Sequence, residues 1–161
     1  MSRTEFTVGV ISDTHGLLRP EAVALLTGTD HIIHAGDIGN ADILRQLSAI
    51  APVTAVRGNN DQGAWTSRIP ETEVVQVGAA IIYVIHDVHA LNLDPAAAGF
   101  HAVIAGHSHR PGIELHQGVL FINPGSAGPR RFKLPVSMGH LTISGTSITP
   151  RLLELTVHSD A

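Results

Sequence analysis

Cysteine is absent from all 161 residues of the sequence. Disulfide bonds, thiolate metal sites and cysteine nucleophiles are therefore excluded, and any bound metal ion must take nitrogen and oxygen ligands. A chain without cysteine also suits a reducing compartment. Its chemistry has to come from carboxylate, imidazole, amide and hydroxyl groups.

Basic runs and long apolar runs are missing too. Lysine and arginine number 10 against 14 aspartate and glutamate residues, so we expect no stable nucleic-acid binding. No apolar stretch approaches the roughly 20 residues that cross a bilayer, and the first residues lack the apolar core of a signal peptide. We therefore expect a cytoplasmic protein without a membrane partner.

Length and composition predict one domain over residues 1–161. Apolar residues make up 43% of the chain, enough for a sizeable core, and no proline-rich, serine-rich or charged linker divides it. The last residues, 157–161, are expected to be frayed. A homo-oligomer is compatible with the apolar strands, but no interface can be assigned.

The first half of the chain alternates strands and helices. Apolar, β-branched runs predict strands at residues 6–11, 31–35 and 53–56. Helical spacing predicts helices at residues 20–26 and 40–50, the second capped by Asn40 or Asp42. Successive strand-helix units indicate a mainly parallel sheet with helices packed on it.

The second half is richer in strands. One helix is predicted there, at residues 94–99, where a proline precedes three alanines, and Gly78 marks a tight turn. The expected strands cover residues 73–77, 79–85, 102–105, 119–122, 137–143 and 147–155. These patterns do not choose between one doubly wound sheet and two mixed sheets.

Six of the apolar runs end in loops that begin with Asp, His, Asn or Gly. Because the carboxyl ends of parallel strands share one edge of a sheet, residues far apart in the sequence should meet there. The two members of each D-x-H or H-x-H pair should project to one side of an extended segment. The candidate site residues are Asp13, His15, Asp37, Asn59, His86, His107 and His109.

These seven side chains make chemical sense as a metal site. Carboxylate, imidazole and amide oxygen are ligands that Mn, Fe, Ni, Co and Zn ions accept when no thiolate is offered. Seven candidates exceed the needs of one ion, whereas two ions about 3.5–4 Å apart, bridged by one carboxylate, would use them all. Such a pair clamps the attacking and leaving oxygens in phosphoryl displacement.

Each motif taken alone has an ordinary structural interpretation. Asp13 and His15 could be turn residues, Gly36-Asp37 could begin a helix, and residues 58–61 could form a simple turn. All of these would have to coincide, which favours the metal site. His34 fits either a core position or a contact of the neighbouring loop. The other histidines are expected to be structural or exposed, namely His31, His89, His101, His116, His140 and His158.

Six motifs follow one another along the chain: Asp13-x-His15, Gly36-Asp37, Gly58-Asn59-x-Asp61, His86, Gly106-His107-x-His109 and Asn123-Pro124-Gly125-Ser126. In this order they resemble the motifs of the calcineurin-like metallophosphoesterases, especially the small bacterial and archaeal phosphodiesterase branch. The resemblance implies an α/β fold, a four-layer αββα sandwich of two mixed β-sheets flanked by helices. It also implies one metal held by Asp13, His15 and His109, a second held by Asn59, His86 and His107, and Asp37 bridging both.

The resemblance further implies hydrolysis of a small phosphate ester, most readily a phosphodiester, by a hydroxide that two divalent metal ions activate. Manganese is the expected ion, and Ni, Co, Fe or Zn are compatible with the ligands. Asp37 and Asn59 are the implied catalytic residues, since Asn59 could bind metal through its oxygen and donate its NH₂ to a phosphate oxygen. Asp61 is expected to orient a neighbouring histidine.

Two positions depart from the family pattern. Many members have histidine after the metal-binding asparagine, whereas this chain has Asn60, which cannot act as a general acid. We therefore expect better activity on esters with acidic leaving groups, such as aryl phosphodiesters. The second departure is Asp87 after His86, which adds negative charge and is a candidate partner of a metal ligand. Arg130 and Arg131 could meet a phosphate or belong to a solvated loop.

Two other functions stay open. The resemblance extends to a eukaryotic membrane-coat subunit of the same fold that serves as a protein-binding scaffold. A complete set of ligands favours the enzyme, because a scaffold has no need of one. A metal-bound sensor or nucleotide-binding regulator is the third hypothesis, and no residue excludes it.

Overall fold

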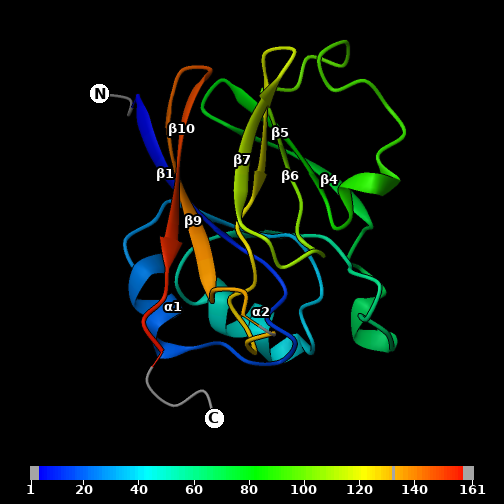
Figure 1. Cartoon of the computed structure of the whole chain (residues 1–161), viewed down its shortest axis with the longest axis vertical. Helices are drawn as coiled ribbons and strands as arrows, with labels where there is room; N and C mark the ends of the chain where they lie inside the picture. The colour runs from blue at the N-terminus through cyan, green and yellow to red at the C-terminus, as the bar shows by residue number, and fades with distance from the viewer. Residues whose placement is uncertain (1–3, 132, 158–161) are drawn as a thin grey trace.

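Two five-stranded β-sheets pack face to face in the computed structural model, which describes residues 4–131 and 133–157 (Figure 1). The first sheet, in the order β10-β9-β1-β2-β3, contains β1 (Glu5–Ile11), β2 (His31–His34), β3 (Val53–Ala55), β9 (Ser137–Ser144) and β10 (Ser147–Glu154). The second, in the order β4-β5-β6-β8-β7, contains β4 (Thr72–Val77), β5 (Ala80–Ile85), β6 (Ala102–Ile104), β7 (Gly112–His116) and β8 (Val119–Asn123).

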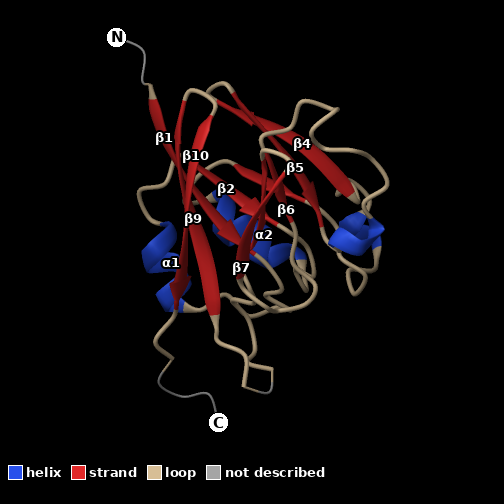
Figure 2. Cartoon of the chain, turned by 45° about the horizontal axis from the view of Figure 1, so that its top comes forward, coloured by secondary structure: helices blue, strands red, loops and turns tan. Residues whose placement is uncertain are grey.

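Helices are few and short (Figure 2). They are α1 (Pro20–Leu26), α2 (Ala41–Ser48) and the 3₁₀ turns η1 (Ala64–Thr66) and η2 (Val88–Ala90). None of the helices in the described ranges is long and apolar enough to cross a membrane.

Each sheet contains three neighbouring parallel strands, which reach the edge of the first sheet at β3 and lie inside the second. β1, β2 and β3 are parallel neighbours in the first sheet, and β5, β6 and β8 are parallel neighbours in the second. Antiparallel strands flank them, with β9 and β10 beside β1, β4 beside β5, and β7 beside β8. The sandwich of two mixed sheets is therefore confirmed, and a single doubly wound sheet is not formed.

Alternation along the strands builds the core. Val8 and Val10 of β1 face Ile82 and Val84 of β5 across the interior between the sheets, and all four are fully buried. The opposite side of the first sheet, with Ile11, packs under the helices. This division follows from the two-residue period of a strand.

Both helices cover the first sheet because each presents an apolar side to it. Ala22 and Leu26 of α1 and Ile43 and Leu47 of α2 are buried in the same cluster. α2 begins after Asn40, whose side-chain oxygen accepts a hydrogen bond from the Ile43 amide at 3.3 Å. The two predicted helices are confirmed, and Asn40 is the cap of the second.

Loop rather than α-helix covers the outer face of the second sheet over the described residues. The predicted helix at residues 94–99 is wrong: turns follow Asp94, and the Phe100 amide donates to the Pro95 carbonyl at 3.0 Å. A segment this short forms too few hydrogen bonds to offset helix nucleation. Leu91 and Phe100 pack against Tyr83 instead, so the fourth layer of the sandwich is mostly loop.

β7 is the strand that was not predicted. It pairs with β8 across a turn at Gln117 and Gly118. Its place at the sheet edge leaves Ile113 40% exposed and Leu115 70% exposed. Two apolar residues in a five-residue edge strand provide too little alternation to separate it from a loop. Fraying was expected at residues 157–161, and a structural or exposed position was expected for His158. Residues 158–161 lie outside the described residues.

Gly9 tests how closely α1 approaches β1. A Cβ atom on Gly9 would lie 2.3 Å from Cδ2 of the fully buried Leu26. We expect Gly9→Ala to lower the free energy of unfolding by about 1–3 kcal/mol through overpacking, and Leu26→Ala by about 2–5 kcal/mol through a cavity. The double variant should cost less than the sum, because the new methyl group enters the space that Leu26 leaves. Urea denaturation measures all three values, and strict additivity would contradict this contact.

Candidate metal centre

All seven candidate residues lie in loops at the carboxyl ends of parallel strands. Those of the first sheet follow β1, β2 and β3, and they are Asp13, His15, Asp37 and Asn59. Those of the second sheet follow β5 and β6, and they are His86, His107 and His109. The packing of the sheets brings the two sets of loops together at one edge of the sandwich.

Sharp backbone turns set the directions of these side chains. The backbone φ angle lies in the left-handed region at five of them: 55° at Asp13, 47° at His15, 56° at Asp37, 69° at His107 and 62° at His109. The expectation that the D-x-H and H-x-H pairs lie in extended segments is therefore wrong. Non-glycine residues rarely adopt this conformation, and its strain is typical of functional sites.

Asp13 is fully buried, and the protein satisfies only one of its carboxylate oxygens. Oδ2 accepts hydrogen bonds from the Ser12 hydroxyl at 2.6 Å and from the His107 amide at 3.0 Å. Oδ1 has no hydrogen-bond partner among the described residues, and it lies 3.4 Å from Nε2 of His109 and 3.7 Å from Nε2 of His15. A buried carboxylate oxygen in this position is costly unless a cation or a proton lies beside it.

One hydrogen bond determines the tautomer of His86. Its Nδ1 lies 2.7 Å from the Ala35 carbonyl oxygen, which can only accept, so Nδ1 carries the proton of the neutral ring. Nε2 then presents a lone pair, which faces Oδ2 of Asp37 at 3.4 Å and Oδ1 of Asp13 at 4.0 Å. These three acceptors repel one another unless a positive charge lies between them.

The pKa values of the cluster respond to this crowding. Burial opposes ionisation of Asp13, but the neighbouring His109 and the charge on His86 lower its pKa below the ordinary value. Burial also opposes ionisation of Asp37, yet His86 and hydrogen bonds from Asn60 depress its pKa strongly. Burial disfavours the charged form of His86, but Asp37 and Asp13 outweigh it and raise the pKa, so without a metal ion the two carboxylates favour a proton on Nε2, where a metal ion would otherwise bind. Both carboxylates are therefore ionised at neutral pH and attract a cation.

Two overlapping groups of ligand atoms result. The first group contains Asp13, His15 and His109, and the second contains Asp13, Asp37 and His86. Within each group the ligand atoms lie within 4.8 Å of one another. Oδ2 of Asp37 also lies 3.9 Å from Nε2 of His15, so this carboxylate reaches toward both groups. Imidazole nitrogens with carboxylate oxygens are a donor set that fits divalent transition-metal ions.

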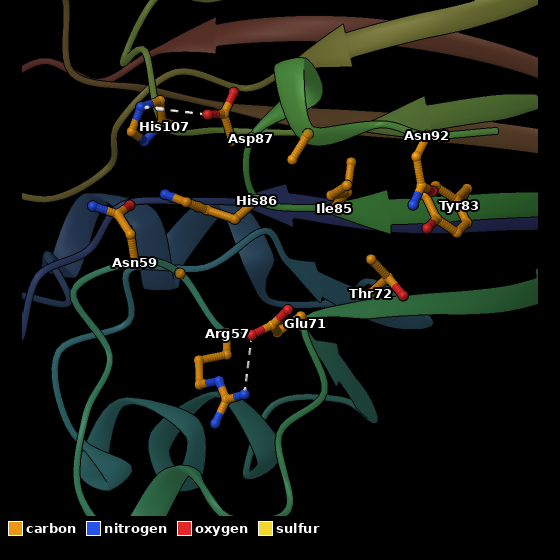
Figure 3. Close-up of a pocket in the computed structure, with 12 residues that line it drawn as sticks. Arg57, Asn59, Glu71, Thr72, Tyr83, Ile85, His86, Asp87, Asn92 and His107 are labelled. Atoms are coloured by element: carbon orange, nitrogen blue, oxygen red, sulfur yellow. Dashed lines mark hydrogen bonds and ion pairs between the residues drawn. The ribbon is translucent and has the colours of Figure 1, made fainter.

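His107 lies outside both groups, and Asn59 lines the same pocket as His107. Both border a pocket of about 360 Å³ that also touches His86, and Figure 3 shows the three side chains together at one end of it. The His107 ring meets His86 edge-on, with ring centroids 5.2 Å apart. Its Nε2 lies 3.8 Å from Oδ2 of Asp87, which brings a further negative charge to the centre.

Asp61 joins two site loops, which corrects the expectation that it orients a histidine. Its carboxylate accepts hydrogen bonds from the amides of Ile38 at 2.9 Å, Gly39 at 3.1 Å and Gly58 at 2.9 Å. The loops after β2 and β3 are thereby held against each other. Glycine is required at position 58 because a Cβ there would lie 2.1 Å from Oδ1 of Asp37.

The segment Asn123-Pro124-Gly125-Ser126 supports the remaining loops. The Asn123 side chain donates to the Gly106 carbonyl at 3.0 Å, and the Ser126 hydroxyl donates to the Asp13 carbonyl at 2.9 Å. These bonds connect the loops after β6 and β1. Arg130 and Arg131 are exposed in the chain that follows.

His34 is both a core residue and a link between the loops after β1 and β2. Its Nδ1 accepts from the Gly36 amide at 3.1 Å, and its Nε2 lies 2.9 Å from the Thr14 hydroxyl oxygen. Because the Thr14 hydroxyl donates to the Ile38 carbonyl at 2.7 Å, Nε2 of His34 must be the donor in the shared bond. The ring is neutral with both nitrogens used, and burial lowers its pKa to about 4.

The other described histidines are structural or exposed. The ring of His31 bonds the Thr54 hydroxyl, that of His101 accepts from the Ile81 amide, and that of His140 donates to the Leu25 carbonyl. His89 and His116 are exposed. Sequence reasoning separated these residues from the site because none of them follows a buried strand directly.

The family model of the calcineurin-like phosphoesterase superfamily domain matches residues 6–146. The chain belongs to this superfamily. A probable metallophosphoesterase of Methanothermobacter thermautotrophicus is 36% identical over 157 residues and covers 91% of each chain. A phosphodiesterase of Methanocaldococcus jannaschii is 28% identical over 136 residues, which cover 73% of this chain and 82% of that protein.

The fold also matches a solved structure of Vps29. The zinc complex of Vps29 from Entamoeba histolytica is 24% identical, has a TM-score of 0.72, and covers 92% of this chain and 98% of that chain. Calcineurin-like phosphoesterases use divalent metal ions, and the two ligand groups of this chain fit such ions. Membership therefore makes the protein a metal-binding phosphoesterase domain.

Because buried His34 is neutral, protein stability should depend on pH. The pKa of this imidazole is 6.5 in a model peptide and about 4 in the folded protein, so the unfolded chain binds more protons between these values. The contribution is fully present above pH 6.5 and is lost as the pH falls toward 4, by up to about 3 kcal/mol of unfolding free energy. We expect His34→Gln to remove this part of the pH slope in urea denaturation of the metal-free protein between pH 4.5 and 7. Equal slopes in both proteins would contradict a neutral His34.

Proposed function

We propose that the protein is a phosphodiesterase that hydrolyses a small phosphate ester with two divalent metal ions. The observation that carries the proposal is the set of facing acceptors, in which ionised Asp13 and Asp37 oppose the Nε2 lone pair of His86 at 4.0 Å and 3.4 Å. Membership of the phosphoesterase superfamily and the similarity to an archaeal phosphodiesterase support the class of reaction.

In this proposal the ligands divide between two ions. Asp13, His15 and His109 hold the first, Asn59, His86 and His107 hold the second, and Asp37 lies between them. The donor set suits manganese and is compatible with Ni, Co, Fe or Zn. When bound, the ions lower the pKa of a water molecule toward neutrality and neutralise charge on the phosphate oxygens.

The chain's own residues orient the substrate and keep the site rigid. Asn59 is exposed at the end of the pocket, where its amide NH₂ can donate to a phosphate oxygen. Asp61 holds the loops that carry Asp37 and Asn59 through three backbone amides. Such preorganisation reduces the reorganisation needed as negative charge develops.

A protein-binding scaffold is the alternative function. The similarity to Vps29 supports it at the level of the fold. Two ionised buried carboxylates need a positive charge beside them, which a metal ion supplies and which a scaffold that binds no metal would have to obtain by protonating His86. We therefore place the enzyme first, with a small soluble ester as its substrate and no nucleic-acid or membrane partner.

Removal of Asp37 tests the metal-dependent reaction. We expect metal-stripped protein to hydrolyse bis-p-nitrophenyl phosphate only after Mn, Ni, Co, Fe or Zn is added. Asp37→Ala should lower kcat/KM more than about a hundredfold, since loss of a group that merely supports a ligand already costs 10–100-fold. Plasma mass spectrometry should detect two ions per wild-type chain and fewer in the variant.

Asp42→Ala is the matched control, because Asp42 lies in the exposed first turn of α2. It should keep both the activity and the bound metal. Hydrolysis by the metal-free protein, or full activity of Asp37→Ala, would overturn the proposal. Two bound ions without activity on any ester would instead favour the scaffold.

Asn60 bears on whether the leaving group of the ester can be protonated. Its backbone amide donates to Oδ1 of Asp37 and its side chain donates to Oδ2, both at 2.9 Å. A carboxamide next to Asp37 can hold this carboxylate but cannot protonate a leaving alcohol. The proposed enzyme is therefore suited to esters whose leaving group is already a stable anion.

A series of methyl aryl phosphates with phenols of rising pKa tests this consequence. The wild-type rate should fall steeply along the series. Asn60→His should raise the rate on the poorest leaving group relative to the best by about a hundredfold, which is the lower range of general acid catalysis. Asn60→Ala, which removes only the side-chain hydrogen bond to Asp37 and adds no acid, should show no such gain. A shallow wild-type dependence would contradict the absence of a general acid.

A further inference from the structure

We propose that the pocket beside His86 binds one organic group of the phosphodiester and selects an uncharged group of nucleoside size. The inference rests on the proposed function, because the metal centre is what holds the phosphate at the pocket's end. It adds a specificity site and a substrate class that the metal ligands by themselves do not define.

The pocket is continuous with the metal centre. Asn59, His86 and His107 form its near end, and Figure 3 shows Thr72 and Asn92 at the opposite end. A phosphate at the near end therefore directs one ester arm into the pocket. Its volume of about 360 Å³ lies at the lower end of the range for small-molecule sites.

The strand β5 sets the length of this pocket. His86 follows the strand directly, and Ile85 and Tyr83 alternate on its outer side. A rise of about 3.3 Å per residue places Tyr83 roughly 10 Å from His86. A sugar with one ring attached spans such a distance, whereas a methyl group would leave most of the pocket to water.

The floor of the pocket is apolar and firmly packed. Tyr83 is 7% exposed and Ile85 is 6% exposed, and the Tyr83 ring stacks on Phe100 with centroids 5.1 Å apart at 14°. A flat ring can lie on such a floor without displacing it. Thr72 and Asn92 are exposed at the rim and offer hydrogen-bonding groups to hydroxyl or ring substituents.

The charges around the pocket disfavour a second anionic group. Arg57 is the cationic residue that lines it, and its guanidinium is paired with Glu71 at 3.3 Å. Asp87 adds another carboxylate on the opposite side. With Arg57 neutralised by its partner, Asp87 leaves the side chains of the pocket wall with net negative charge, which an additional phosphate away from the metal ions would meet.

The 3₁₀ turn η2 offers a matched pair of variants. Ala90 lines this pocket, whereas Val88, two residues earlier on the same turn, lines a separate pocket with Phe121. Ala90→Phe reduces the space for the organic group, and Val88→Phe adds the same ring outside it. Circular dichroism and thermal melts establish that both variants are folded.

The test compares two esters with the same leaving group, p-nitrophenyl thymidine 5′-phosphate and methyl p-nitrophenyl phosphate. Wild-type protein loaded with manganese should prefer the thymidine ester in kcat/KM by about tenfold or more, the effect of one well-fitted group. Ala90→Phe should lower this preference about tenfold, and Val88→Phe should keep it. An unchanged preference in folded Ala90→Phe, or none in the wild type, would overturn the proposal.

The charge argument is tested with the thymidine ester that bears a second phosphate on its 3′ oxygen. We expect the wild type to turn it over about tenfold less efficiently than the unphosphorylated ester, and Glu71→Gln to narrow the difference. Equal efficiency in the wild type would refute selection for an uncharged group.

Thymidine alone separates failure of this inference from failure of the proposed function. In the metal-free protein, thymidine should shift the NMR amide signals of Thr72, Tyr83 and Asn92, and Ala90→Phe should weaken these shifts. Shifts without hydrolysis of any ester would support the pocket and refute the enzyme. Hydrolysis without shifts and without a preference would support the enzyme and refute the pocket.

Discussion

Mutual repulsion among three buried acceptors is the constraint on which the rest of the structure depends. Nε2 of His86 lies 4.0 Å from Oδ1 of Asp13 and 3.4 Å from Oδ2 of Asp37, and the ligand atoms of the three residues lie within 4.8 Å of one another. Folding brings them together only because the other atoms of these groups are firmly held. Oδ2 of Asp13 accepts from Ser12, and Nδ1 of His86 donates to a backbone carbonyl. The free energy of folding therefore offsets the repulsion among the three acceptors, and a bound cation removes that repulsion.

The two sheets make this assembly possible. Each ends its parallel strands at the same edge of the sandwich, and each contributes part of the ligand set. The left-handed turns at Asp13, His15 and Asp37 then direct these side chains toward the loops of the second sheet. Hydrogen bonds of Asp61, His34 and the Asn123 segment keep the loops in place. These bonds, rather than contacts among the ligand side chains, stabilise the strained left-handed backbone.

The outer face of the second sheet is covered by loop where the sequence pattern predicted a helix. Where the sequence pattern predicted a helix at residues 94–99, a loop with η2 covers Tyr83 and Phe100. Ala90 of η2 and Asn92 after it line a pocket next to His86. The candidate metal centre and this pocket thus share the strand-end residues Asn59, His86 and His107, and η2 with the loop after it adds Ala90 and Asn92 to the pocket.

Local sequence determined a large part of this protein. Apolar runs that end in Asp, His or Asn mark the buried parallel strands and their carboxyl-end loops. Pro20 as the first helical residue marks the start of α1, and the cap Asn40 marks the start of α2. Other features followed from contacts between distant segments. The left-handed turns, the role of Asp61 between two loops, the edge strand β7 and the pocket over Tyr83 depend on neighbours more than 20 residues away or on position in a sheet. Side-chain pattern reports what a segment can bury, whereas only tertiary packing decides which atoms meet.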